Sequence, residues 1–223
     1  MRHFKFSDIF IGIVFTLLFI SIAVVITINF RPLYYMDINT LNIEAASGME
    51  KAEIIKNYDA LIDYCSPFFT GDLNFPTLEA SASGLQHFAE VKNIFTSFYF
   101  IGALTLIIGV VIIIRKAKNR DFYYLLVSAI TAIVLPLLLG AYIAIDFDRA
   151  FLLFHQLCFK NDYWIFDPAT DPVILMLPEA FFMHCAILII AIVLLCCAAF
   201  IGIFFWKKSH VSIRNRKSKG LKF

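Results

Sequence analysis

The chain has 223 residues, of which 61% are hydrophobic and only 16% are charged. A soluble domain of this size is about half apolar and about a quarter charged, so the composition excludes an ordinary soluble protein. The formal net charge of +2 is uninformative as a total. We therefore expect a polytopic membrane protein, in which the distribution of charges carries more information than their sum.

Four apolar runs are long enough to cross a hydrocarbon core about 30 Å thick. The first run is longer than the apolar part of a signal peptide, and small residues at a cleavage-site spacing do not follow it. We expect it to remain as a transmembrane helix. The sequence thus predicts a mainly α-helical fold in one membrane domain. The spans cover residues 8–30, 95–114, 122–145 and 180–206, the two long connections residues 31–94 and 146–179, and the tail residues 207–223.

Basic residues mark one side of this predicted topology. Thirteen of the 19 Lys and Arg residues lie in the N-terminal head, in the 115–120 turn or in the tail. Because basic residues near span ends stay in the cytoplasm, both termini are predicted to be cytoplasmic. Both long connections should then pack together at the extracytoplasmic face. The basic tail is interpreted as an anchor beside anionic membrane lipid, and no nucleic-acid partner is expected.

The 31–94 connection contains two predicted helices. Ser47 and Glu50 have the spacing of a capping box, and apolar residues then recur at helical spacing up to Cys65. A proline follows, so this helix should end near Cys65. We interpret it as a surface helix packed on its own domain in preference to a partner-binding site. Ser83 is expected to cap a second helix that continues into the second span.

The 151–182 segment (FLLFHQLCFKNDYWIFDPATDPVILMLPEAFF) is the most informative part of the sequence. It is too polar to span and too aromatic to be disordered, so we expect an ordered loop against the membrane. Asp167 and Asp171 each precede a proline, and such steps form stiff turns. Trp164 is expected to anchor at the membrane interface. These residues are interpreted first as a scaffold that positions His155.

Two histidines, His87 and His155, are the candidate catalytic residues, because both are predicted near the membrane edge on one face. His87 has Glu90 at i+3 on the same helical face, where a carboxylate can orient an imidazole. Apolar neighbours should lower the pKa of His155, which would keep it neutral and usable as a base. Either histidine taken alone is more simply explained as a structural residue. For the two together, a structural role and a functional role explain the sequence equally well. For His184, one turn inside the fourth span, the sequence leaves two interpretations open: it faces a polar cavity, or it faces the helix bundle.

Other chemistries find little support in the sequence. Two histidines and scattered acidic residues do not form a metal site. Cys158 has apolar neighbours typical of an inert buried thiol, and no serine lies in a nucleophile elbow. A disulfide between Cys65 and Cys158 is left open.

Two motifs resemble the lipoprotein intramolecular transacylase family of Gram-positive bacteria, which are small four-span membrane proteins. The first motif, HFAEVKNIF, matches at His87, Val91 and Lys92, with Glu90 where the family usually has Asp. The second motif is longer and more specific. It matches at His155, Phe159, Trp164, Phe166, Asp167, Pro168, Asp171, Pro172, Pro178, Glu179 and Phe182. Hydropathy, topology and connection lengths agree over the whole chain.

The resemblance implies an acyltransferase that acts on a diacylglyceryl-modified lipoprotein in the cell membrane. The sn-2 acyl chain would move from the glyceryl oxygen to the α-amino group of the N-terminal cysteine, giving a lyso-form lipoprotein without any cofactor. We expect His155 to act as base and then acid, with His87 or Lys92 donating to the tetrahedral oxyanion. An acyl-imidazole intermediate is an alternative route. The enzyme is expected to be a monomer. Its supporting or substrate-positioning residues would be Glu90, Lys92, Trp164, Asp167, Asp171 and Glu179.

Two other classes of protein compete with this interpretation. A non-enzymatic membrane assembly or sensor protein would bind a partner through the two long connections and would tolerate His155→Ala. A transporter is disfavoured, because the spans are nearly free of charge and no pair of broken helices is visible in the sequence.

Overall fold

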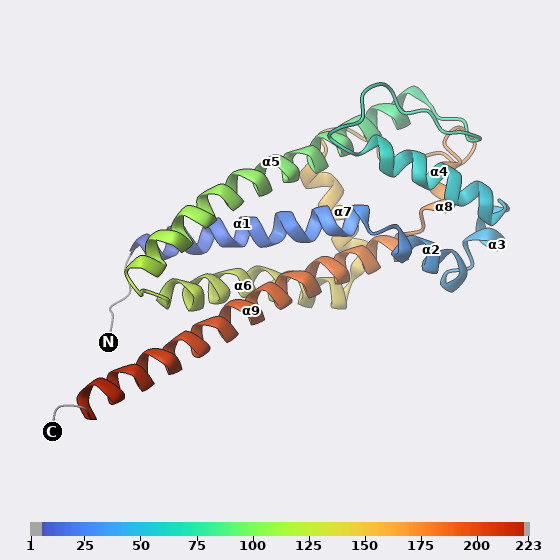
Figure 1. Ribbon diagram of the computed structural model, residues 1–223. Helices are drawn as coiled ribbons and strands as arrows, with labels where there is room; N and C mark the ends of the chain where they lie inside the picture. The colour runs from blue at the N-terminus through green and yellow to red at the C-terminus, as the bar shows by residue number, and fades with distance from the viewer. Residues whose placement is uncertain (1–5, 221–223) are drawn as a thin grey trace. The chain divides into compact units, whose positions relative to one another are not determined.

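The computed structural model describes residues 6–220, and over this range the chain forms helices and no strands. Four of the helices are long and apolar enough to cross a membrane, namely α1, α5, α6 and α9. The predicted mainly α-helical fold with four transmembrane helices is therefore confirmed. The head residues Arg2 and Lys5 lie outside the described residues. The helices (Figure 1) are α1 (Phe6–Asn29), α2 (Arg31–Thr40), α3 (Ile43–Ser47), α4 (Lys51–Tyr64), α5 (Ala82–Lys118), α6 (Tyr123–Ile145), α7 (Phe147–Cys158), α8 (Val173–Met176) and α9 (Glu179–Gly220).

Helix α5 is longer than a membrane crossing requires. Its 37 residues correspond to roughly 55 Å at about 1.5 Å per residue, against about 30 Å of hydrocarbon. The helix begins at Ala82, well before the apolar run that starts at residue 95. The helix predicted in the 31–94 connection therefore does continue into the second span, and its first turns carry His87.

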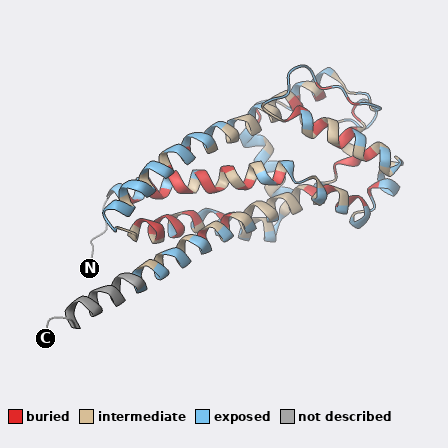
Figure 2. Ribbon diagram, viewed as in Figure 1, coloured by how far each residue is buried: buried red, intermediate tan, exposed pale blue. Residues whose placement is uncertain are grey.

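Much of the apolar surface of the long helices is exposed (Figure 2). In the most apolar stretch of α5 and of α9 only 11% of residues are buried, against 44% in α1. Exposed apolar faces of this extent mark contact with lipid or a partner. On helices of spanning length and hydropathy, lipid contact is the simplest explanation.

By their internal contacts the residues divide into two compact units. Unit 1 comprises residues 1–22, 101–139 and 190–223, and unit 2 comprises residues 23–100 and 140–189. Within unit 1, a Cβ at Gly12 would lie 2.8 Å from Thr131 Oγ1. The absence of a side chain at Gly12 thus lets α1 and α6 approach closely, as small residues do between membrane helices.

The core of unit 2 mixes aliphatic and aromatic side chains and joins the two long connections. Tyr34 of α2 stacks on Tyr58 of α4 with ring centroids 3.7 Å apart, and Phe181 of α9 packs edge-on against Tyr34 at 5.0 Å. The buried Tyr34 hydroxyl donates to the main-chain oxygen of Met176 at 2.6 Å. Aromatic pairs of this kind contribute about 0.5–1.5 kcal/mol beyond their buried area. The 31–94 and 146–179 connections are therefore packed together, as predicted.

The predicted helix ends are partly right. Helix α4 ends at Tyr64 with Cys65 as its C-cap, as expected. The capping box is wrong, because α4 begins after Glu50 with no side-chain cap. Ser47 instead closes α3, where its hydroxyl donates to the Ile43 oxygen at 2.7 Å.

The predicted cap of the following helix is also corrected. Ser83 lies inside the first turn of α5, and the hydroxyl that accepts from the backbone N–H of Gly84 belongs to Ser81, at 3.0 Å. The helix starts at Ala82, two residues before the Gly84 that a cap at Ser83 predicts. The Asp171 carboxylate of the other long connection also binds this helix start, because it accepts from the backbone N–H of Ser81 at 2.8 Å.

Candidate active site

His155 lies in the last turn of α7. Asp146 caps the start of this helix by accepting from the backbone N–H of Arg149 at 2.9 Å. The Nδ1 atom of His155 lies 2.9 Å from the main-chain oxygen of Phe151. A carbonyl oxygen only accepts, so Nδ1 must carry the proton. In the neutral ring Nε2 then holds the free lone pair, which is the arrangement that a general base needs.

Aromatic rings surround the His155 imidazole. Its centroid lies 4.2 Å from that of Phe151, 4.9 Å from Trp164 and 5.7 Å from Phe159. Burial among these rings lowers the pKa of His155 below its usual 6.5, and this outweighs the hydrogen bond to Phe151, which raises it. The ring is therefore mostly neutral at neutral pH, as its apolar neighbours in the sequence predicted.

His87 lies in the second turn of α5 and is 5% exposed. Its ring packs against Phe159 at 4.7 Å and Phe166 at 5.5 Å between centroids. Among the residues that the structure describes, its Nδ1 atom has no hydrogen-bond partner. A buried polar atom left without a partner is rare and costs about 1–3 kcal/mol, so it needs a functional or structural reason.

The two histidines form a pair, although they come from different connections of the chain. Their ring centroids are 6.2 Å apart and their planes are inclined by 30°. Phe159 contacts both rings. The two imidazoles therefore belong to one site, built from both long connections.

Two polar residues of the first motif have partners other than the histidines. The Glu90 carboxylate accepts from the side-chain amide of Asn161, at 3.0 Å to Oε1 and 3.2 Å to Oε2. It was expected to orient His87, but this amide from the second connection engages it. The ammonium of Lys92 donates to the main-chain oxygen of Phe69 at 3.0 Å and lies 4.3 Å from the centre of the Tyr64 ring.

Trp164 belongs to the wall of the histidine site. Its indole N–H donates to the main-chain oxygen of Asn161 at 3.0 Å, while its ring packs on His155. These contacts agree with the predicted role of Trp164 as a scaffold for His155. They also give it a specific hydrogen bond inside unit 2, which the sequence, suggesting only an anchor at the membrane interface, did not predict.

The acidic residues of the second motif differ in their surroundings. Asp171 is buried, and its Oδ1 atom accepts from the backbone N–H of Ser81 at 2.8 Å, at the start of α5. Asp167 is exposed and accepts from the backbone N–H of Ala169 at 2.9 Å, which forms a turn. Glu179 is the exposed first residue of α9. Asp171 is thus the one of these three that helps to position the helix carrying His87.

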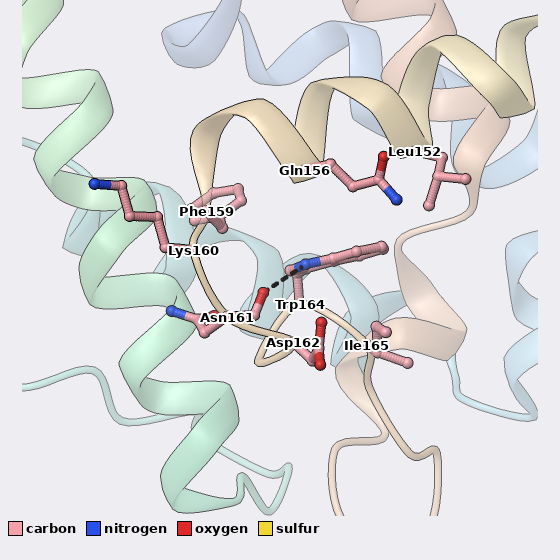
Figure 3. Close-up of a pocket in the computed structure, with 8 residues that line it drawn as sticks. All are labelled: Leu152, Gln156, Phe159, Lys160, Asn161, Asp162, Trp164 and Ile165. Atoms are coloured by element: carbon pink, nitrogen blue, oxygen red, sulfur yellow. Dashed lines mark hydrogen bonds between the residues drawn. The ribbon is translucent and has the colours of Figure 1, made fainter.

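A cavity of about 330 Å³ lies between α7 and the loop that follows it, and neither His87 nor His155 is among its lining residues (Figure 3). Leu152 and Gln156 border it from α7, and the Trp164 ring lies across from them. Two of its lining residues, Phe159 and Trp164, also pack against the His155 ring. Its lining is half polar: Leu152, Gln156, Phe159, Lys160, Asn161, Asp162, Trp164 and Ile165.

His184 has a partner that the sequence analysis missed. Its Nδ1 atom lies 2.8 Å and 2.9 Å from the two carboxylate oxygens of Asp37, which is 4% exposed. This pair ties α2 to α9. The only sequence signal was an acidic residue set within the apolar pattern of residues 31–40, directly after the first span.

The cysteines of the two connections are free. Cys65 is buried, and burial raises the pKa of its thiol to about 12, so it is not a thiolate at neutral pH. Cys158 is exposed, which corrects the expectation of a buried thiol, although partial burial still raises its pKa. Within residues 6–220 there is no cluster of three or more His, Cys, Asp or Glu side chains suited to a metal ion.

The helices and the paired imidazoles define a class: a polytopic membrane protein with a site suited to acid–base chemistry. The family described as lipoprotein intramolecular transacylase Lit matches residues 9–182. The chain therefore belongs to this family of membrane acyltransferases, and the resemblance of its two motifs is confirmed. The comparison with curated proteins gives no match.

Solved structures of the transacylase Lit from Bacillus cereus are similar to this chain over almost its full length. One has a TM-score of 0.89 and 38% sequence identity, and the similarity covers 93% of this chain and 98% of that one. Two others, one with a histidine-to-arginine and one with a histidine-to-alanine mutation, have TM-scores of 0.83 and 0.82 at the same identity. They match 93% of this chain and 95% and 96% of their own.

Proposed function

We propose that this enzyme moves the sn-2 acyl chain of a diacylglyceryl lipoprotein to the α-amino group of its N-terminal cysteine. The family name supports a lipoprotein substrate and transfer within one molecule. The observation that carries the proposed chemistry is the hydrogen bond from His155 Nδ1 to Phe151, because it leaves Nε2 as the proton acceptor beside a second histidine.

The reaction needs one base that later serves as an acid. The neutral amine attacks the ester carbonyl carbon, and His155 Nε2 takes the proton that the nitrogen loses as the C–N bond forms. The tetrahedral intermediate then breaks its bond to the glyceryl oxygen, and the imidazolium returns the proton to this oxygen. The products are an amide and a free sn-2 hydroxyl, so atoms and charge balance without a cofactor. Such general acid–base catalysis is worth about 10²–10⁴-fold.

His87 is assigned the second role, the stabilisation of the oxyanion. It is buried, its Nδ1 atom has no partner among the described residues, and its ring lies 6.2 Å from that of His155. A donor aimed at the oxyanion is worth about 3–4 kcal/mol in comparable sites. Lys92, the alternative donor, is held by Phe69 and Tyr64, so we assign the role to His87.

The membrane location of the substrate fits this site. A lipoprotein is held by its acyl chains, so its ester and its amine lie at the membrane interface. The basic head, turn and tail support cytoplasmic termini, and with them an extracytoplasmic site formed by the two long connections. The half-polar cavity beside Trp164 suits the polar part of the substrate better than an acyl chain.

The test is mass spectrometry of a lipoprotein N-terminal peptide from three matched cell cultures: with this enzyme, without it, and with His155→Ala. Transfer leaves the total mass unchanged, so fragmentation must locate the acyl group. We expect the acyl group on the cysteine nitrogen only with the wild-type enzyme. A free amine in all three cultures would reject the proposal and leave the long connections as a binding surface.

A further inference from the structure

Asn161 connects the helix that carries His87 to the ring that packs on His155. Its side-chain nitrogen donates to both carboxylate oxygens of Glu90, one turn beyond His87 on α5. Its main-chain oxygen accepts from the indole N–H of Trp164 at 3.0 Å. One residue thus touches both halves of the histidine site without contacting either imidazole through a hydrogen bond.

The orientation of the Asn161 amide is fixed by its partners. Its Oδ1 atom accepts from the backbone N–H of Tyr163 at 3.1 Å, which can only donate, while the Glu90 carboxylate can only accept. The nitrogen must therefore face Glu90. Hydrogen bonds to a carboxylate are stronger than neutral ones, and this one is half-buried on both sides.

Resting on the function proposed above, we infer that Asn161 is a positioning residue that sets the spacing of His87 and His155. Glu90 fixes α5 relative to the loop, and the loop fixes Trp164 against His155. A displacement of about 1 Å in a catalytic geometry can cost about 100-fold in rate. The loss of this bridge should therefore lower turnover, although Asn161 supplies no proton to the reaction.

The bridge, which is the hydrogen bond between the side chains of Asn161 and Glu90, can be tested by changing the lengths of these two side chains. Asn161→Gln lengthens one arm by a methylene and Glu90→Asp shortens the other, so each single variant mismatches the bridge while the double variant restores its total length. We expect each single variant to lose about 10- to 100-fold in kcat with little change in KM, and the double variant to recover most of it. Asn74→Ala, in an exposed loop outside the bridge, is the control and should keep wild-type turnover.

A second measurement reports on the geometry directly. With Trp206→Phe as background, Trp164 is the only tryptophan, and its fluorescence should shift in both single variants and return in the double variant. Because His155 and Trp164 are packed together, the acid limb of the pH–rate profile should move in the same variants.

The outcomes separate this inference from the proposed function. If the wild-type enzyme forms no N-acyl product from a synthetic diacylglyceryl lipopeptide, the proposed function fails. If the wild type turns over and the single variants keep its kcat, pH profile and fluorescence, the role of Asn161 alone is refuted. A folded double variant no better than the singles also refutes it, because matched arms should then restore the bridge.

Discussion

Asp171 of the second long connection holds the first turn of the helix that carries His87, through the hydrogen bond from Ser81 N–H to its Oδ1 atom at 2.8 Å. Asp171 is 3% exposed, so this contact is protected from water. A carboxylate at a helix start satisfies an unpaired N–H and interacts favourably with the helix dipole. The two sequence motifs are therefore parts of one structural unit.

Gly84 should not tolerate a side chain, because a Cβ there would lie 2.2 Å from Asp171 Oδ1. We expect Gly84→Ala to displace the Asp171 carboxylate and to cost about 0.5–2 kcal/mol, the usual value of a lost N-cap. Thermal unfolding in detergent micelles measures this, with Gly202→Ala as the matched control because its Cβ would meet nothing within 4 Å. Equal stability of the two variants would show that Asp171 does not brace α5.

Both histidines should be needed for turnover. We expect His155→Gln to lose about 10²–10⁴-fold through the missing base, and His87→Gln about 10²–10³-fold through the missing oxyanion donor. The measurement is kcat on a synthetic diacylglyceryl lipopeptide, with Leu157→Ala, at an exposed position of α7, as control. Full turnover in His87→Gln together with its loss in His155→Gln would disprove the two-histidine site.

The pH dependence should show a base with a lowered pKa. Because burial lowers the pKa of His155, the ring becomes protonated only below its usual 6.5. The attacking amine must be neutral, and its pKa is about 8, so the rate should already fall as pH drops below 8. Loss of the His155 base should add a second, lower limb, which steepens this fall only below pH 6.5. A lower limb centred above 6.5, or one that survives in His155→Gln, would contradict this assignment.

The pair of His184 and Asp37 should stabilise unit 2. Removal of the imidazole by His184→Ala leaves a buried carboxylate without its 2.8 Å partner, which should cost about 1–3 kcal/mol. Asp37→Asn in the same background removes the charge and should recover part of this loss. The unfolding midpoints of the single and double variants provide the test. Additive losses would mean that the two residues do not interact energetically.

The sequence predicted the helices better than the contacts between the connections. Spans are visible because about 20 apolar residues are needed to cross a membrane, and His87 and His155 stood out as histidines near span ends. The sequence assigned the helix cap to Ser83, whereas the structure gives it to Ser81. Local spacing cannot show that Asp171 also binds this helix start. Long-range partners such as Asn161 for Glu90 leave no periodic signal in a single sequence.

The alternative explanations also depended on such contacts. Trp164 in isolation fits a membrane anchor, and only its packing on His155 assigns it to the site wall. His184 stayed undecided because its partner, Asp37, lies far away in the sequence and carries no motif.

The most direct test of the account is a crossover experiment with the purified enzyme. Two lipopeptides are mixed, one isotopically labelled in its sn-2 acyl chain and the other in its peptide, and the N-acyl products are located by fragmentation mass spectrometry. Transfer within one molecule predicts products in which each acyl chain stays with its original peptide, and their loss in His155→Gln. Products with exchanged chains, or N-acylation that persists without His155, would contradict the central claim.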